Sequence, residues 1–319
     1  MTTRSFLVGG AGFIGSHLTD RLVERGPVTV YDNLSVGKRA FIGSHLVSGR
    51  ATLVEADALD LDRLTHEMKG HDVVFHLAAN PEARWGLERT RLDLEQGTIA
   101  TYNVLEAMRR SGVPRLIFSS SGTVYGDTAE RCAEGDLGKL PISLYGASKL
   151  AGEALISAFS SCFGLHATIF RFGNVVGPRG THGAALDFLN KLKREPTYLE
   201  VLGDGLQAKP YLFVTDCTEG LVFGLDHARG PLDIWNLAPP DETSVAKIAA
   251  LCVEASPYKN AEIRYTGGDR GWPGDVPRSR MSPERLALHG YVVRYTSDEA
   301  VDLAVKALAR EVFPESPAA

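Results

Sequence analysis

Tyr145 and Lys149 are the residues of this chain whose types and spacing point most directly to chemistry. Four positions separate them, so they share one face of a helix whose start is marked by Pro-Ile-Ser at 141–143. A free phenol, with a pKa of about 10, is a poor base at neutral pH, but a neighbouring ammonium favours the phenolate. We therefore predict that Tyr145 is a general acid/base activated by Lys149; the alternative is a solvated helix face.

A run of three serines supplies a third polar group. Ser119, Ser120 and Ser121 follow the apolar run Arg115 to Phe118, which we predict to be the strand before the helix of Tyr145. A hydroxyl there can hydrogen-bond a substrate oxygen as that oxygen passes between alcohol and ketone. We predict that Ser121 has this role; the alternative is that the serines only cap the strand and start a turn.

A glycine-rich turn at 9–15 follows the first apolar strand, Ser5 to Val8. Its G-x-x-G-x-x-G spacing lets backbone amides approach a pyrophosphate at the start of the next helix. A second apolar run, Val28 to Tyr31, ends in Asp32, whose carboxylate would accept both ribose hydroxyls and repel a 2′-phosphate. Together the two halves predict a dinucleotide site for NAD rather than NADP. The alternative is a turn where a strand and a helix merely pack closely, followed by an aspartate that caps the end of a strand.

The elements that must position these groups alternate between strand and helix. The predicted strands are Ser5 to Val8, Val28 to Tyr31, Ala51 to Glu55, Val73 to Phe75, Arg115 to Phe118 and Ala167 to Phe170. The predicted helices are Ile14 to Glu24, Asp60 to Met68, a long helix that ends near Arg110, and Tyr145 to Cys162. Near-continuous apolar strands between amphipathic helices predict an α/β fold, a Rossmann doubly wound parallel sheet with a smaller C-terminal α/β substrate-binding domain.

We expect the first domain to span residues 1–172 and the second, rich in glycine and proline, to span 173–319. Parts of 211–240, namely Leu212 to Val214 and Ile234-Trp235, are expected to rejoin the main sheet as strands.

Composition excludes several other classes. The 319 residues carry a net charge of −5 with both signs interspersed, which argues against nucleic acid or an anionic membrane as partner. No apolar run reaches membrane-spanning length, and the first residues lead into a strand rather than a signal peptide, so we expect a cytoplasmic protein. The four cysteines have no metal-ligand spacing, and no metal site is predicted.

Taken together, these motifs resemble those of the extended short-chain dehydrogenase/reductases, and within them most closely the UDP-glucose 4-epimerase group. The resemblance covers nearly the whole chain and is carried by Gly9 to Gly15, Asp32-Asn33-Leu34, Asp57, His76 to Ala79, Ser119 to Gly126, Tyr145-x-x-x-Lys149, Arg171 to Pro178, Gly203-Asp204-Gly205-x-Gln207 and Gly274 to Pro277.

The resemblance implies roles for residues at matching positions. The implied catalytic residues are Ser121, Tyr145 and Lys149. The implied cofactor-binding residues are Gly9, Gly12, Phe13, Ile14, Gly15, Asp32 at the adenosine ribose, Asn33, Asp57 at the adenine, Ala58, Leu77, Ala78, Ala79, Ser119, Tyr145 and Lys149. The implied substrate-binding residues are Arg84, Ser121, Tyr145, Asn174 at the diphosphate, Leu202, Lys209, Arg270 and Ser279.

Three positions depart from the family pattern. Lys209 stands where an arginine usually meets the diphosphate, which keeps the charge but loses the fork, and Pro210 follows in place of an acidic or small polar residue. Gly97 stands where an asparagine near the cofactor is common, and a glycine cannot make that side chain's hydrogen bonds.

The resemblance implies an isomerase, an NAD-dependent C4 epimerase that acts on a nucleotide sugar through a transient 4-keto sugar. The alternatives are a 4,6-dehydratase, another 4-keto-sugar short-chain dehydrogenase, and a non-catalytic NAD-binding scaffold. Against dehydration, Gly122 and Thr123 stand where dehydratases carry an Asp-Glu pair.

The sugar and the assembly are further expectations. The small residue at Ser279 would leave room for an N-acetyl group, so UDP-GlcNAc/UDP-GalNAc stands beside UDP-glucose/UDP-galactose. A basic group such as Arg84, Arg179 or Arg278 would equally suit UDP-glucuronate. The resemblance also implies a homodimer, formed through two amphipathic helices at 98–109 and 149–159.

Overall fold

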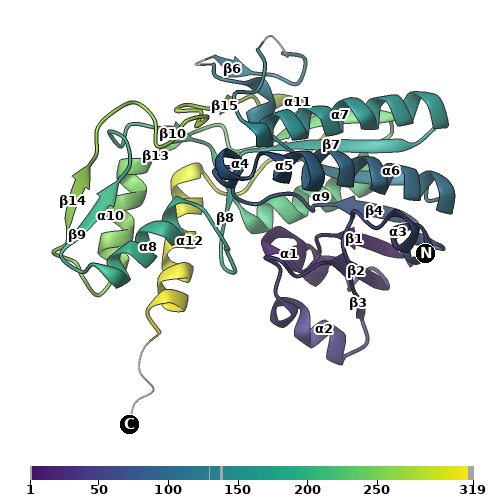
Figure 1. Cartoon of the computed structure of the whole chain (residues 1–319), viewed down its shortest axis with the longest axis horizontal. Coiled ribbons are helices and arrows are strands. Elements are labelled where there is room, and N and C mark those ends of the chain that lie inside the picture. The colour runs from purple at the N-terminus through teal and green to yellow at the C-terminus, as the bar shows by residue number, and fades with distance from the viewer. Residues whose placement is uncertain (1, 129, 137–138, 315–319) are drawn as a thin grey trace.

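The computed structural model describes residues 2–128, 130–136 and 139–314. Its centre is a seven-stranded parallel sheet in the order β12-β7-β5-β4-β1-β2-β3 (Figure 1). The strands are β1 (Ser5–Val8), β2 (Val28–Asp32), β3 (Ala51–Glu55), β4 (Val73–His76), β5 (Arg115–Ser121), β7 (His166–Phe172) and β12 (Leu232–Leu237). The strand order reverses between β1 and β4, where doubly wound sheets bind ligands. The predicted Rossmann fold is therefore confirmed.

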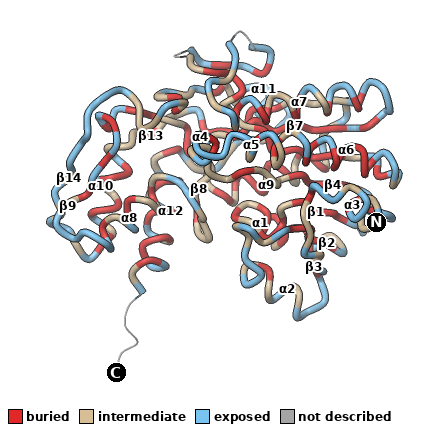
Figure 2. The backbone as a smooth tube through the Cα atoms, in the orientation of Figure 1, coloured by how far each residue is buried: buried red, intermediate tan, exposed pale blue. Residues whose placement is uncertain are grey.

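The sheet lies between two layers of helices, because its strands carry apolar side chains on both faces and each face packs against one layer. In β1, Leu7 packs toward one helix layer, whereas Phe6 and Val8 pack toward the other, as the twofold period of a strand requires. The first layer holds α1 (Phe13–Leu22) and α9 (Val214–His227), and the second holds α3 (Leu61–Met68), α6 (Ala100–Ser111) and α7 (Leu144–Phe163). Figure 2 shows the central strands largely buried and the outer helix surfaces exposed.

A second lobe lies to the left in Figure 1 and encloses its own apolar core. Its helices are α8 (Ala184–Arg194), α10 (Val245–Ala255) and α12 (Ser297–Val312). Its short strands pair as β8 (Asn174–Val176) with β11 (Tyr211–Phe213), β9 (Tyr198–Val201) with β14 (Glu262–Tyr265), and β10 (Ala208–Lys209) with β13 (Thr243–Ser244).

The remaining elements are short and lie in the segments between the elements already named. They are α2 (Gly43–Val47), α4 (Trp85–Glu88), α5 (Thr90–Asp93), α11 (Glu284–Leu288), the strand pair β6 (Arg131–Cys132) and β15 (Arg280–Met281), the 3-10 helices η1 (Arg39–Ile42) and η3 (Gly122–Tyr125), and the π-helix η2 (Leu94–Ile99).

Of the two late segments expected to rejoin the main sheet, one does so. Ile234 and Trp235 lie in β12, which pairs with β7. The expectation for Leu212 to Val214 was wrong, because β11 pairs with β8 instead. After Gly173 the chain forms β8, which pairs with β11 as a separate two-stranded sheet. A Cβ on Gly173 would lie 2.6 Å from the carbonyl oxygen of Pro210, so the segments that lead into β8 and β11 approach closely there. The domain boundary at residue 172 stays a prediction.

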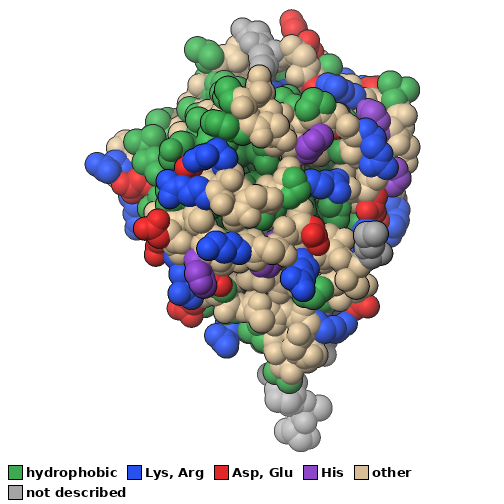
Figure 3. Space-filling model, turned by 90° about the vertical axis from the view of Figure 1, so that its right-hand side faces the viewer, with side chains coloured by type: hydrophobic (Ala, Val, Ile, Leu, Met, Phe, Trp, Pro, Cys, Tyr) green, Lys and Arg blue, Asp and Glu red, His purple; other side chains and the backbone are tan. Residues whose placement is uncertain are grey.

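The surface carries the mixture of acidic and basic side chains that the composition predicts. Acidic and basic side chains are interspersed on the face shown in Figure 3. Among the residues described, no helix combines the length and the apolar character needed to cross a membrane.

A buried ion pair ties the helix of the predicted catalytic residues to the sheet. Arg171 on β7 has no exposed surface, and its Nη2 lies 2.7 Å from Oε2 of Glu153 on α7. Oε1 of Glu153 also accepts a hydrogen bond from Ser120 on β5. The Nη1 atom of Arg171 donates to the Tyr125 hydroxyl at 3.0 Å, so both charges are fully surrounded by partners.

We expect Arg171→Met to lower the free energy of unfolding by about 3–5 kcal/mol, because Glu153 would keep a buried charge without its partner. Arg50→Met removes an exposed ion pair with Glu24 and should cost no more than about 1 kcal/mol. Denaturant unfolding of both variants measures the difference. Equal losses in the two variants would contradict the role given to the buried pair.

Candidate active site

Two adjoining cavities lie at the carboxyl ends of the central strands. The first cavity, of about 440 Å³, borders the turn between β1 and α1 and the ends of β2, β4 and β5. The second cavity, of about 390 Å³, lies between these strand ends and the second lobe. The walls of both cavities share Phe13, Ile14, Pro81, Ser120, Tyr145, Phe172 and His182. Tyr145 therefore faces both cavities.

The glycine-rich turn has no room for side chains. Gly9 has a φ of +83°, and a Cβ there would lie 2.7 Å from the backbone nitrogen of Ala78. A Cβ on Gly15 would overlap the carbonyl oxygen of Gly9. Helix α1 begins after Gly12 with no side-chain cap, so its first backbone N–H groups remain available to an anion. The turn thus forms the cradle that a pyrophosphate needs.

Asp32 is held rigidly at the end of β2. Its Oδ2 accepts a hydrogen bond from the backbone of Ala11 at 2.9 Å, and its Oδ1 accepts one from Leu34 at 2.9 Å. Burial raises the pKa of Asp32, and these two hydrogen bonds oppose the rise. Each carboxylate oxygen keeps a second lone pair for a ribose hydroxyl, so the site fits NAD.

The first cavity brings together nearly all of the residues predicted to bind the cofactor. Its wall contains Gly9, Gly12, Phe13, Ile14, Gly15, Asp32, Asn33, Ala58, Leu77, Ala78, Ala79, Ser119, Tyr145 and Lys149. Asp57 is not in this wall; its Oδ2 accepts a hydrogen bond from the side chain of Asn33 at 2.9 Å. The adenine contact of Asp57 stays a prediction.

Lys149 is buried between α7 and β5. Helix α7 starts with a Ser143 cap on the backbone of Gly146, which directs Lys149 to the end of β5, where its Nζ donates to the carbonyl of Ser119 at 2.6 Å. Burial lowers the pKa of Lys149 to about 8, and the carboxylates of Glu153 and Asp93 oppose this shift. At neutral pH the side chain therefore remains an ammonium.

Tyr145 is half-buried, and its phenol needs a nearby cation to become a base. Burial raises the pKa of Tyr145 to about 12, the Ser121 hydroxyl acts in the opposite direction, and Asp93 adds to the rise. Ser121 is itself held by the backbone and the hydroxyl of Thr123, at 3.2 and 3.0 Å. A positive charge brought into the first cavity would favour the phenolate.

The second cavity brings together most of the residues predicted to bind the substrate. Its wall contains Arg84, Ser121, Tyr145, Asn174, Leu202, Lys209 and Ser279. Arg270 is not in the wall: its Nη2 lies 2.8 Å from Asp127, and its Nη1 donates to the carbonyl of Asp275 at 3.2 Å. A phosphate contact by Arg270 stays a prediction.

The departures at Lys209 and Pro210 have a local explanation. The Nζ of Lys209 lies 2.6 Å from Asp275, which leaves two of its three N–H donors for a ligand. Pro210 lies between β10 and β11, where it interrupts the strand, and its carbonyl accepts from the backbone of Asn174 at 2.8 Å. The proline therefore helps to hold Asn174 at the cavity.

Gly97 lies in the π-helix η2, against the catalytic helix. A Cβ at this position would lie 2.6 Å from the Cβ of Ser148 and would overlap its hydroxyl. The missing side chain therefore allows η2 and α7 to pack closely beside Lys149. The sequence showed the departure, but not this packing.

Sequence reasoning missed four polar residues at the site. Gln207 lines the second cavity with 4% of its surface exposed, and neither atom of its amide has a hydrogen-bond partner among the described residues. Glu82 and His182 line the same cavity, and Asp93 acts on the pKa values of both predicted proton-handling residues. Only Gln207 had a sequence signal, its place in the quoted glycine-rich motif.

Comparison with known proteins agrees with this geometry. The sequence profile of the NAD dependent epimerase/dehydratase family matches residues 5–238. The chain belongs to this family. A crystal structure of a UDP-galactose 4-epimerase superposes with a TM-score of 0.87 at 38% identity, covering 98% of this chain and all of the other. A UDP-glucose 4-epimerase of Thermus thermophilus, solved with NAD, gives 0.85 at 29% identity and covers 96% and 99%.

Sequence relatives include different nucleotide-sugar enzymes. A UDP-glucose 4-epimerase of Mycolicibacterium smegmatis is 33% identical over 77% of this chain and 80% of its own. A UDP-N-acetyl-alpha-D-glucosaminuronate decarboxylase of Bacillus cytotoxicus is 32% identical over 78% and 79%. The predicted family, the NAD cofactor and the isomerase class are confirmed. The sugar is not decided by these relatives.

We expect Gly9→Ala to weaken NAD binding by at least about tenfold, because a Cβ at φ +83° would press against the backbone of Ala78. Calorimetric titration with NAD measures the loss. Gly43→Ala is the matched control, since a Cβ there meets no atom within 4 Å. Unchanged affinity in the Gly9 variant would show that the turn does not bind the pyrophosphate.

Proposed function

We propose that this protein is an NAD-dependent C4 epimerase of a UDP-linked sugar. The observation that carries the proposal is the position of Tyr145 in the wall shared by a dinucleotide cavity and a second cavity lined by Ser121 and Lys209. A group at this wall can exchange a proton with a substrate in one cavity while the substrate carbon faces the other. The similarity to UDP-sugar 4-epimerases supports the same reaction.

Each catalytic residue then has a definite task. Tyr145, as phenolate, removes the proton from O4 of the sugar, and Ser121 donates a hydrogen bond to the same oxygen. Lys149 stabilises the phenolate by its charge. NAD held by the glycine-rich turn and Asp32 would supply reversible hydride acceptance at C4, from one face of the sugar and back to the other. Tyr145 gives its proton back to O4, so the net change is inversion at C4.

The second cavity must hold the diphosphate while the sugar turns. Lys209 and Asn174 are the residues we assign to the diphosphate, and both lie on the second-lobe side of the cavity. An anchor at the diphosphate leaves the sugar able to rotate at the end occupied by Tyr145. This division of roles is what a 4-epimerase requires, because both faces of C4 must reach the same redox partner.

The alternatives fit the geometry less well. Dehydration needs an acid and a base beside the sugar, but Gly122 and Thr123 occupy that part of the second cavity. A non-catalytic scaffold would not need Ser121, Tyr145 and Lys149 gathered at the junction of two cavities. The small side chain of Ser279 also lines the second cavity, which supports room for an N-acetyl group.

We also propose a homodimer in the cytoplasm. Several apolar side chains on η2, α6 and α7 are exposed to solvent, which supports a partner on this helix face. Their exposed fractions are 50% for Leu94, 39% for Ile99, 44% for Tyr102 and 57% for Phe163. A monomeric mass in solution would exclude the dimer.

Tyr145→Phe should abolish epimerisation while NAD binding stays within about twofold of the unaltered protein, because only the hydroxyl is lost. Proton NMR with UDP-glucose, UDP-GlcNAc and UDP-glucuronate in separate tubes follows the anomeric signal of the C4 epimer. Tyr102→Phe removes a hydroxyl from an exposed tyrosine and is the matched control. Turnover by the Tyr145 variant would overturn the mechanism.

Lys149→Met should move the acid limb of kcat/KM to higher pH. The ammonium lies 5.8 Å from the centre of the Tyr145 ring and a nearby positive charge favours the phenolate, so its removal should raise the pKa of Tyr145, and the base form should then appear only at higher pH. Lys306→Met, in an exposed ion pair on α12, should leave the profile unchanged. An acid limb that stays in place in the Lys149 variant would mean that Lys149 does not tune the base.

A further inference from the structure

The three arginines that the sequence offered for a uronic acid are all engaged with carboxylates. Arg179 lies 3.0 Å from Asp20, and Arg278 lies 3.3 Å from Glu242. Neither arginine lines the second cavity. Of the three, only Arg84 lines the second cavity, so only Arg84 could bind a sugar carboxylate there.

Arg84 is held by Glu82 in a two-point contact. Its Nε lies 3.0 Å from Oε1 of Glu82 and its Nη2 lies 2.9 Å from Oε2, while its backbone N–H also donates to Oε1 at 3.2 Å. Glu82 is fixed in turn, because its backbone N–H donates to the side chain of Asn80 at 3.1 Å. This fork-to-fork geometry is the strong form of an arginine–carboxylate contact.

Glu82 and Arg84 both line the second cavity, and we assign the sugar to the part of it beside Tyr145, where the proposed function places O4. Glu82 follows Pro81, which lines both cavities together with Tyr145. The guanidinium of Arg84 also feels the carboxylates of Asp187 and Asp275, and these raise its pKa further. His182, in the shared wall, has its pKa lowered by burial and is neutral at neutral pH. The surroundings of Arg84 are thus anionic or neutral.

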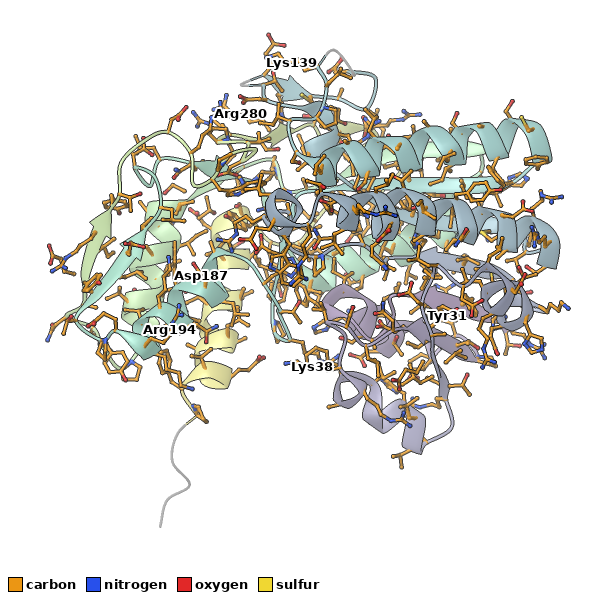
Figure 4. The ribbon with its side chains drawn as sticks, viewed as in Figure 1. Tyr31, Lys38, Lys139, Asp187, Arg194 and Arg280 are labelled. Atoms are coloured by element: carbon orange, nitrogen blue, oxygen red, sulfur yellow. The ribbon has the colours of Figure 1, made fainter. Side chains whose placement is uncertain are left out.

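The charges of the second cavity cancel as a whole. Each charged side chain in its wall has an opposite partner in the same wall: Glu82 with Arg84 at 2.9 Å, Asp187 with Lys191 at 3.3 Å, and Asp275 with Lys209 at 2.6 Å. Figure 4 places Asp187 on α8 of the second lobe. Lys209 keeps two free N–H donors for a phosphate, whereas the Nε and Nη2 of Arg84 are both taken.

We infer that Glu82 is a specificity-determining residue that excludes an anionic group at C6, so that the site takes a neutral hexose or N-acetylhexosamine in place of a hexuronate. This inference rests on the proposed function. A C6 carboxylate would have to compete with Glu82 for Arg84, and the two like charges would repel each other in a half-buried site. A C6 hydroxyl carries no charge and meets no such repulsion.

The test compares UDP-glucose with UDP-glucuronate on the NAD-loaded protein. We expect UDP-glucose to have at least about a tenfold lower Kd by calorimetry, and a higher rate of epimerisation by NMR. Glu82→Gln keeps the shape of the side chain and removes its charge, which frees Arg84 for a sugar carboxylate. The ratio of the two Kd values should then shift at least about tenfold toward UDP-glucuronate.

Glu242→Gln is the matched control, because it releases Arg278 and Arg280 outside the cavity wall by the same chemical change. It should leave the ratio unchanged, and retained NAD binding shows that each variant is folded. Equal or tighter binding of UDP-glucuronate by the unaltered protein, or an unchanged ratio in the Glu82 variant, overturns the inference alone. Failure of both sugars to bind or react overturns the proposed function together with it.

Discussion

The buried contact between Glu153 and Arg171 is the interaction on which the site depends most. It joins α7 to β7, the next element of the chain, and through Ser120 to β5, so one charge pair ties the helix to two neighbouring strands of the sheet. Lys149 lies one turn before Glu153 on the same helix, and its ammonium reaches the carbonyl of Ser119. Helix α7 therefore cannot slide along the sheet without breaking a contact between buried charges, which is costly.

The fixed position of α7 on the sheet also determines where Tyr145 lies relative to the two cavities. A parallel sheet gathers the ends of its strands at one edge, and α7 passes across that edge with Tyr145 in the wall between the cavities. The close packing of Gly97 against Ser148 brings η2 to the same point. Tyr145 therefore lies where the proposed proton transfer and the NAD site meet, with the ammonium of Lys149 5.8 Å from the centre of its ring.

Charge pairing also characterises the second cavity, where each cationic side chain in the wall lies beside a carboxylate. A wall with no net charge does not repel a dinucleotide in the neighbouring cavity, and it lets single N–H donors select the position of a phosphate. In the proposed selection of the sugar, a further carboxylate would have to compete with Glu82 for Arg84.

Local patterns in the sequence were enough to predict the fold and to select residues most of which line the two cavities. The glycine spacing, the apolar strands and the Tyr145/Lys149 pair each depend on a few neighbouring residues, and the parallel topology then gathers the strand ends. Most of the residues predicted to bind the cofactor needed nothing more, since they stand at or just beyond the end of a strand or at the start of α1.

Tertiary structure alone decided which charges are free. Arg84 and Arg270 look alike in the sequence, yet one lines the second cavity and the other pairs with Asp127 outside its wall. The sequence also did not predict that β11 pairs with β8, or that the buried amide of Gln207 has no hydrogen-bond partner among the described residues. The physical reason is that burial, and long-range ion pairs such as that of Arg270 with Asp127, depend on contacts between distant segments, which no local spacing encodes. Strands, turns, helix faces and short-range pairs such as that of Glu82 with Arg84 are set by residues close together in the chain.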